Sequence, residues 1–209
     1  MRRVLSFLGT AAVAALLLNV FIGLVPAALL WVFGHALFPE EAGGSLVVRD
    51  GRVIGSRLIG QGFTDPKYFH PRPSVAGDNG YDGLASGGTN FAPMNDKLVS
   101  KLKENAAAYR AENGLAPNTP IPADAAMTSG SGLDPHIGEE NALLQVARVA
   151  RARGADPARV RALVESRVEG PEWGFLGDRR VNVLLLNLAL DEAPARAAAA
   201  ERRVSPGEP

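Results

Sequence analysis

A hydroxyl, a carboxylate and an imidazole stand close together in the stretch from Ser129 to His136, which reads Ser-Gly-Ser-Gly-Leu-Asp-Pro-His. Serine hydrolases use these side chains, but the Gly-x-Ser-x-Gly pattern of a nucleophile elbow is missing. Neighbours in sequence also rarely form a catalytic triad, which is a spatial arrangement. We interpret the stretch as a turn in which Asp134, before Pro135, caps a short helical turn. Its candidates for ligand or partner binding are Ser129, Gly130, Ser131, Gly132 and Asp134.

A second glycine-rich stretch, Ser86 to Asn90, offers backbone amides that could cradle an anion. No Gly-x-x-x-x-Gly-Lys-[Ser/Thr] pattern accompanies it. No Lys or Arg occurs between Gly77 and Asn95, and Asp78 and Asp82 would repel a phosphate. We therefore expect a glycine-rich turn that holds no ATP. Its candidates for ligand or partner binding are Ser86, Gly87, Gly88, Thr89 and Asn90.

The three histidines, His35, His70 and His136, share no spacing typical of metal ligands. We expect no catalytic residues, no metal site and no cofactor of the chain's own. Basic and acidic residues each number 22, so the charge gives no reason to expect nucleic acid as a partner. Cysteine is absent, so no disulfide supports the fold. Five arginines are interpreted as solvated helix faces, with partner docking as the alternative: Arg148, Arg151, Arg153, Arg159 and Arg161.

The chain that positions these candidates begins with a long apolar run, from Val4 to Phe33. A helix of about 20 apolar residues crosses ~30 Å of hydrocarbon, so the run predicts a transmembrane anchor, kinked at Pro26. The apolar part of a cleaved signal peptide is shorter, about 7–15 residues. Arg2 and Arg3 precede the run, so the positive-inside rule predicts a cytoplasmic N-terminus. The predicted divisions are cytoplasmic residues 1–3, a membrane anchor at 4–34, one extracytoplasmic domain at 35–191 and a poorly ordered tail at 192–209.

The predicted fold class is α+β, with a β-hairpin, long Gly- and Pro-rich loops and three to four helices in the domain. Asp50-Gly51 suits a type I′ turn between strands at 45–48 and 52–59. Residues 60–93 show no helical period, but their aromatic rings argue for a loop pinned to the core or to a partner. Helices are predicted at 95–113, at 139–153 and from Asp156-Pro157, with Val160, Leu163, Val164 and Val168 on the apolar face of the third.

Residues 181–190 fit either of two elements. Their β-branched start allows a buried strand, whereas Asn182 as a cap, with Leu185 and Leu188 on one face, allows a helix. We favour the helix.

Several motifs together resemble the C-subunit family of Kdp-type potassium-transporting ATPases of bacteria, over nearly the whole chain up to Asp191. They are Gly55-Ser56 with Leu58-Ile59-Gly60-Gln61, Tyr68-Phe69 before Arg72-Pro73-Ser74, Ser86-Gly87-Gly88-Thr89-Asn90, Thr128 to Ile137, Arg148-Val149-Ala150-x-Ala152-Arg153-Gly154, and Val181-Asn182-Val183 with Leu186 to Asp191. Thr89, Phe91 and Ala125-Ala126 depart from the usual residues.

The resemblance implies a non-catalytic accessory subunit of a high-affinity potassium uptake complex, with one span in the bacterial plasma (inner) membrane. Its partners would be a channel-like potassium-translocating subunit (KdpA-like) and a P-type ATPase subunit (KdpB-like), which is the one that uses ATP. The domain would sit over the outer mouth of the channel-like subunit. The family is described as a catalytic chaperone that raises the ATP affinity of the pump. Two alternatives are a membrane-anchored extracytoplasmic serine hydrolase and a binding module for a solute or for the cell wall.

Overall fold

The computed structural model describes the backbone of residues 2–204 and the side chains of residues 3–193. The chain divides into two compact units, residues 1–54 and 55–209, and each is described by itself.

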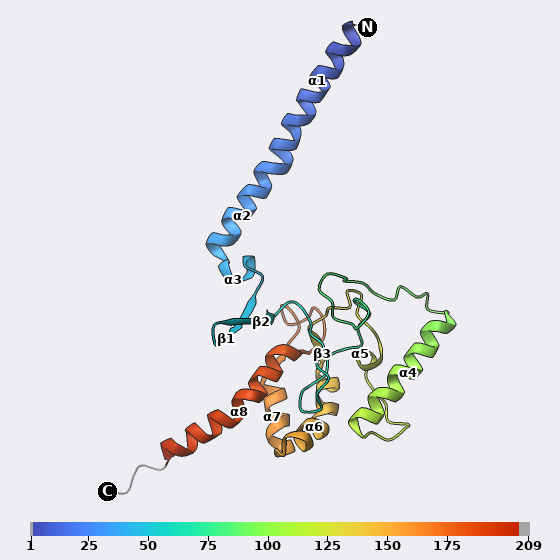
Figure 1. Cartoon of the computed structure of the whole chain (residues 1–209), viewed down its shortest axis with the longest axis vertical. Helices are drawn as coiled ribbons and strands as arrows, with labels where there is room; N and C mark the ends of the chain where they lie inside the picture. Colours follow the sequence, from blue (N-terminus) through green and yellow to red (C-terminus); the bar gives the residue numbers. More distant parts are fainter. Residues whose placement is uncertain (1, 205–209) are drawn as a thin grey trace. The chain divides into compact units, whose positions relative to one another are not determined.

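The first unit begins with the predicted anchor, which is one continuous helical rod (Figure 1). Helix α1 (Arg2–Leu18) passes into a π-helical stretch (Asn19–Leu24) and then into α2 (Val25–Leu37). The most apolar part of the run Arg3–Leu37 has a mean hydropathy of 2.5, and none of that part is buried. The length and composition of the run suit a membrane span. The prediction was a kink at Pro26, which has no N–H to donate to the preceding turn. The structure has a widened, π-helical turn directly before it, over Asn19–Leu24.

A short helix, α3 (Pro39–Ala42), links the rod to a two-stranded hairpin of β1 (Leu46–Arg49) and β2 (Arg52–Ser56). Asp50 and Gly51 have φ values of 51° and 75°. Positive φ at both central residues is what a type I′ turn requires, which confirms the predicted hairpin. Strand β2 ends earlier than predicted.

The helices of the second unit begin and end at the residues that cap them. Helix α4 (Asp96–Asn113) is capped by Asn95 and α7 (Pro157–Ser166) by Asp156, whose side chains accept hydrogen bonds from Lys97 N and Ala158 N. Helix α6 (Glu139–Arg153) ends at a left-handed Gly154, as α4 ends at Gly114. These three helices confirm the sequence prediction. A fourth, α5 (Ala123–Ala126), is a single turn that was not predicted.

A three-stranded antiparallel sheet of order β3-β5-β4 also escaped the sequence prediction. Its strands are β3 (His136–Gly138), β4 (Val168–Glu169) and β5 (Arg180–Asn182). Val168 pairs with Val181 in this sheet, so its assignment to the third helix was wrong. Strands of two or three residues are too short to show the alternation by which a strand is recognised in sequence.

The stretch 181–190 contains both of the elements that were considered. Strand β5 ends at Asn182, and helix α8 runs from Val183 to Val204. The Asn182 side chain accepts a hydrogen bond from Leu185 N at 3.2 Å, which confirms its predicted role as a cap. Residues 205–209 of the predicted tail lie outside the described residues.

The core of the second unit lies where α6, α7 and α8 pack together, α6 against α7 and α7 against α8 (Figure 1). Phe69, from the irregular segment 57–95, is completely buried in this core. The other residues of the core cluster are Ile137, Ala142, Val146, Val149, Ala150, Val160, Val164, Val181, Val183, Leu186 and Leu190.

Candidate functional site

The two glycine-rich stretches selected from the sequence lie against each other. Ser86 Oγ and Gly87 N both donate to the carbonyl of Ser131, at 3.0 Å and 2.8 Å. A Cβ on Gly88 would lie only 2.8 Å from the carbonyl oxygen of Gly130. The two segments therefore approach closely at a point where only glycine fits.

Gly132 is a second position at which the two glycine-rich stretches approach each other closely. Its φ of 67° favours glycine, and a Cβ there would lie 2.7 Å from the carbonyl oxygen of Gly87 and 3.0 Å from Ala76. Its carbonyl accepts a hydrogen bond from Ser74 Oγ at 2.6 Å. The paired segments are thus joined to the first half of the irregular loop.

The two serines of the Ser-Gly-Ser-Gly stretch use their hydroxyls on neighbouring amides. Ser129 Oγ accepts from Gly132 N at 2.9 Å, and Ser131 Oγ accepts from Leu133 N at 3.1 Å. Ser129 is buried, whereas Ser131 and Gly130 are exposed. These hydrogen bonds hold the turn, and they leave the exposed edge at Gly130 as its outward surface.

Thr89 and Asn90 are the last two residues of the Ser86–Asn90 stretch. They help to line a cavity of about 150 Å³ against α4, together with Phe91, Leu102 and Met127. Thr89 is half-buried, and Asn90 is exposed in the left-handed region with φ of 50°. Asparagine tolerates this conformation better than most residues.

Asp134 organises the end of the Ser-Gly-Ser-Gly stretch. Its Oδ1 accepts from His136 N at 2.9 Å, and its Oδ2 pairs with Arg72 Nη1 at 2.9 Å. Burial alone would raise the pKa of Asp134, but its hydrogen bonds with His136 and its pairing with Arg72 hold that pKa below its ordinary value. The turn leads into β3 and not into a helical turn, so that part of the prediction was wrong: Asp134 forms a local side-chain turn before a strand.

His136 lies between two carboxylates. Its Nδ1 is 3.6 Å from Asp134 Oδ1 and its Nε2 is 3.6 Å from Glu169 Oε2. Glu169 in turn pairs with Arg180 at 3.3 Å. The described partners of the His136 imidazole are thus acidic groups, and those of Ser131 belong to its own turn and to Ser86 and Gly87.

A second cluster fixes the segment from Pro66 to His70. Five successive carbonyls of this segment each accept a hydrogen bond from a distant side chain. Arg148 Nη1 donates to Pro66 O at 2.8 Å and to Tyr68 O at 2.9 Å, Arg153 Nε to Lys67 O at 2.7 Å, Asn187 to Phe69 O at 2.9 Å, and Gln145 to His70 O at 3.0 Å. Side chains of α6 and α8 therefore replace the partner strand that this segment lacks.

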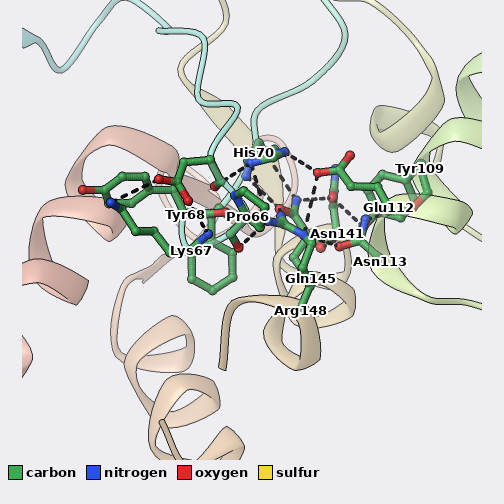
Figure 2. A network of polar contacts seen from close by, with 12 residues as sticks. Pro66, Lys67, Tyr68, His70, Tyr109, Glu112, Asn113, Asn141, Gln145 and Arg148 are labelled. Atoms are coloured by element: carbon green, nitrogen blue, oxygen red, sulfur yellow. Dashed lines mark hydrogen bonds and ion pairs between the residues drawn. The ribbon is translucent and has the colours of Figure 1, made fainter. Parts of the chain in front are cut away.

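Arg148 is the centre of this cluster, and Figure 2 shows it reaching from α6 between the 66–70 segment and α4. It is buried, and it also donates to Asn113 Oδ1 at 3.0 Å and to Gln145 Oε1 at 2.7 Å. Burial lowers its pKa, and the nearby carboxylate of Glu112 opposes that change. The interpretation of Arg148 as a solvated residue was wrong. Arg153, which pairs with Asp191 at 2.8 Å, is also engaged in the fold.

His70 connects the same segment to α4 through an ion pair between its Nδ1 and Glu112. The hydrogen bond with His70 is the main reason that the pKa of Glu112 lies below its ordinary value.

A cavity of about 300 Å³, open to solvent, lies beside this pair. It is lined by residues of the segment 62–81 and of α4, among them Arg72 and Tyr109. Among the side chains of residues 3–193, no group of three His, Asp or Glu residues is arranged to hold a metal ion.

The sequence contained a signal for the Arg148 cluster that its interpretation missed. Asn141, Gln145 and Arg148 follow one another at spacings of four and three, which places them on one face of α6. Beside an apolar stripe, such a polar row reads as the edge of a solvated face. Only the position of the 66–70 segment shows that this row is covered.

Comparison with known proteins identifies the family. The family described as "K+-transporting ATPase, c chain" matches residues 8–192. A protein of Caulobacter vibrioides (strain NA1000 / CB15N), named "Potassium-transporting ATPase KdpC subunit", is 51% identical over 188 residues, 90% of this chain and 93% of that protein. Proteins of the same name from Mycobacterium tuberculosis (strain ATCC 25618 / H37Rv) and Koribacter versatilis (strain Ellin345) are 54% and 48% identical, over 76% and 87% of this chain and 83% and 92% of theirs.

The motifs quoted from the sequence lie within the matched residues, and many of them are the segments that the structure brings together. With its apolar N-terminal helix, the chain belongs to the KdpC family, the accessory subunits of potassium-transporting ATPases.

Proposed function

We propose that this chain acts by assembly, as a non-catalytic subunit that stabilises a potassium uptake complex from outside the membrane. Its N-terminus lies in the cytoplasm and its domain in the extracytoplasmic space, as the charges around the span favour. Its partners are a channel-like potassium-translocating subunit and a P-type ATPase subunit. The chain needs no cofactor of its own, and the partner ATPase is the subunit that consumes ATP.

The observation that carries this proposal is the contact between the two glycine-rich stretches. The hydroxyls of Ser86, Ser129 and Ser131, which a hydrolase would use for chemistry, are engaged with backbone groups of those same stretches. Their joint outer edge, at Gly130 and Ser131, is exposed. A rigid edge of exposed backbone and small side chains suits close approach by another protein, because nothing flexible must be ordered on binding.

The same geometry argues against ATP at the Ser86–Asn90 stretch. A triphosphate site needs several free amides together with a cation. The amide of Gly87 is already donated to Ser131 O, and the stretch lies in a part of the chain without Lys or Arg. An effect on the ATP affinity of the pump would then be transmitted through assembly, since coupling between distant sites requires only two states that both sites bias.

The test compares two substitutions to tryptophan at exposed positions. Both positions have room for a side chain, since a Cβ on Gly130 would have no neighbour within 4 Å and Ala158 of α7 is exposed. Gly130→Trp should reduce copurification with the partner subunits and potassium uptake by at least about tenfold, equivalent to ~1.4 kcal/mol. Ala158→Trp should leave both near wild type. Normal assembly and uptake with Gly130→Trp would sink the proposed docking edge.

The hydrolase alternative has its own readout. Ser131→Ala should keep most of the potassium uptake, because in this proposal the hydroxyl only holds its turn. Complete loss of transport by an intact, assembled complex carrying Ser131→Ala would restore the hydrolase.

Orientation can be tested separately, because the chain has no native cysteine. A cysteine in place of Leu84, whose side chain is 99% exposed, should react with a membrane-impermeant maleimide in intact spheroplasts. One in place of Arg3 should not react. The reverse pattern would overturn the proposed topology.

A further inference from the structure

A short hairpin at residues 171–177, here called the 171–177 tip, exposes three large apolar side chains. Trp173 is 84% exposed, Phe175 72% and Leu176 46%. None of them is used by the glycine-rich edge or by the Arg148 cluster. Single exposed apolar residues need no explanation, but several together on one projection indicate a surface that becomes covered.

The backbone of the tip is fixed by its own hydrogen bonds. Glu172 N donates to Leu176 O and Leu176 N to Glu172 O, both at 2.9 Å, and Gly174 N donates to Pro171 O at 3.0 Å. Trp173 adopts φ of 52°, a conformation that bulky residues rarely take. Such a conformation persists where the surrounding structure enforces it, so the tip presents its rings in one arrangement.

The base of the tip is tied to the three-stranded sheet. Arg180 of β5 pairs with Glu172 at 2.7 Å and with Glu169 of β4 at 3.3 Å. The acidic group within the tip is therefore neutralised by a neighbour. Association of the tip with another surface would depend on apolar burial and not on charge.

We propose that the 171–177 tip inserts into the interfacial region of the lipid bilayer that holds the chain's own anchor. Trp, Phe and Leu are the side chains that interfacial segments bury at the boundary of headgroups and acyl chains. Three side chains on a narrow turn suit shallow insertion into lipid. They offer much less than the ~800 Å² per partner of a stable protein interface.

The tether makes even weak insertion effective. The membrane helix ends at Leu37, and the second unit begins at Gly55. Eighteen residues span at most about 60 Å when fully extended, and the β1-β2 hairpin shortens that reach. The bilayer surface is therefore always near the domain, and a tethered contact needs little intrinsic affinity. The proposed role of the tip is to limit the orientations of the domain above the membrane.

The native tryptophans provide the test, because the chain has only two, Trp31 in the anchor and Trp173. Trp31→Phe leaves Trp173 as the sole tryptophan of the full-length chain, which is reconstituted in phosphatidylcholine vesicles and excited at a wavelength that tyrosine does not absorb. The matched control adds Trp173→Phe and Leu84→Trp, which moves the single tryptophan to another exposed loop position. Lipids brominated close to the headgroup report contact with the interface, and iodide on both sides of the membrane reports exposure to water.

We expect brominated lipid to quench Trp173 at least twofold more than the tryptophan at position 84, and iodide to show the opposite order. The lipid quenching should not change with salt, because charge does not drive it. Quenching of Trp173 by iodide to the same extent as the control would overturn the proposal. Shielding of Trp173 from both quenchers once the partner subunits are co-reconstituted would identify a protein as the occupant, and would overturn it as well.

Discussion

The 66–70 segment and the 171–177 tip both carry aromatic residues outside the helices, but the first buries an aromatic ring in the core and the second exposes its rings. Phe69 is completely buried, whereas Trp173 and Phe175 are exposed. The difference lies in where the backbone hydrogen bonds go. Five carbonyls of the 66–70 segment depend on side chains of α6 and α8, while the backbone bonds of the tip close within the tip itself. A segment that needs distant partners becomes part of the core, and one that satisfies itself is free to project.

The largest expected effect comes from removing Arg148, the side chain that donates the most hydrogen bonds to carbonyls of the 66–70 segment. Arg148→Met keeps much of the buried volume but deprives Pro66 O, Tyr68 O and Asn113 Oδ1 of a donor. It also leaves Glu112 with one cation fewer. Losing one member of a buried charged network costs about 3–5 kcal/mol. We expect a loss of that size in the free energy of unfolding, measured by denaturant titration of the full chain in detergent.

The matched control is Arg151→Met on the exposed face of the same helix, which should stay within about 0.5 kcal/mol of wild type. Equal stability of the Arg148 and Arg151 variants would mean that the 66–70 segment does not depend on its side-chain partners. The contrast with the self-supporting tip would then disappear.

A smaller effect should come from acid, through the contact between the 66–70 segment and α4. The folded-state pKa of Glu112 is below its ordinary value of 4.5 because of its hydrogen bond with His70. The unfolded chain therefore binds more protons than the folded one in this range, so stability rises with pH. The contribution is complete above about pH 4.5 and is lost as pH falls through the folded pKa. It should amount to about 1 kcal/mol or less, since the pair is partly exposed.

The measurement is the free energy of unfolding between pH 3 and pH 7. Glu112→Gln should flatten the acid limb of that profile, whereas Glu104→Gln, which loses only an exposed pair with Lys101, should follow wild type. An unchanged acid limb in Glu112→Gln would mean that the His70–Glu112 pair does not hold the segment to α4.

The amino-acid sequence could predict the features that depend on local signals, but not those that depend on contacts between distant segments. The ends of α4, α6 and α7 could be predicted because Asn95, Asp156 and the glycines after α4 and α6 are local signals that act over one turn. The glycine-rich stretches could be selected by composition, but their pairing across 45 residues could not, since it depends on the whole intervening chain.

Residues outside these local signals were harder to interpret. Arg148 looked solvated because a polar row beside an apolar stripe has the same pattern whether water or a loop covers it. The sheet was missed because its strands are too short to show a period. In both cases the deciding contact comes from a segment distant in sequence, so propensity and periodicity carry no information about it.

The smallest expected change in stability comes from substituting Trp173 in the 171–177 tip. If the ring of Trp173 supported the domain as Phe69 does, its removal would cost several kcal/mol, as in a core. The ring is 84% exposed, and its backbone sits in the left-handed region, where glycine avoids about 1–2 kcal/mol of steric cost. Against this gain, glycine adds conformational entropy to the unfolded chain, about 0.4–1 kcal/mol. We therefore expect Trp173→Gly to leave the free energy of unfolding in detergent unchanged or raised by about 0.5 kcal/mol.

Trp173→Val, which places a β-branched residue at the same positive φ, should lower the free energy of unfolding, because such residues are genuine outliers there. A loss of more than about 2 kcal/mol in Trp173→Gly, the scale of a buried side chain, would show that the tip belongs to the folded core.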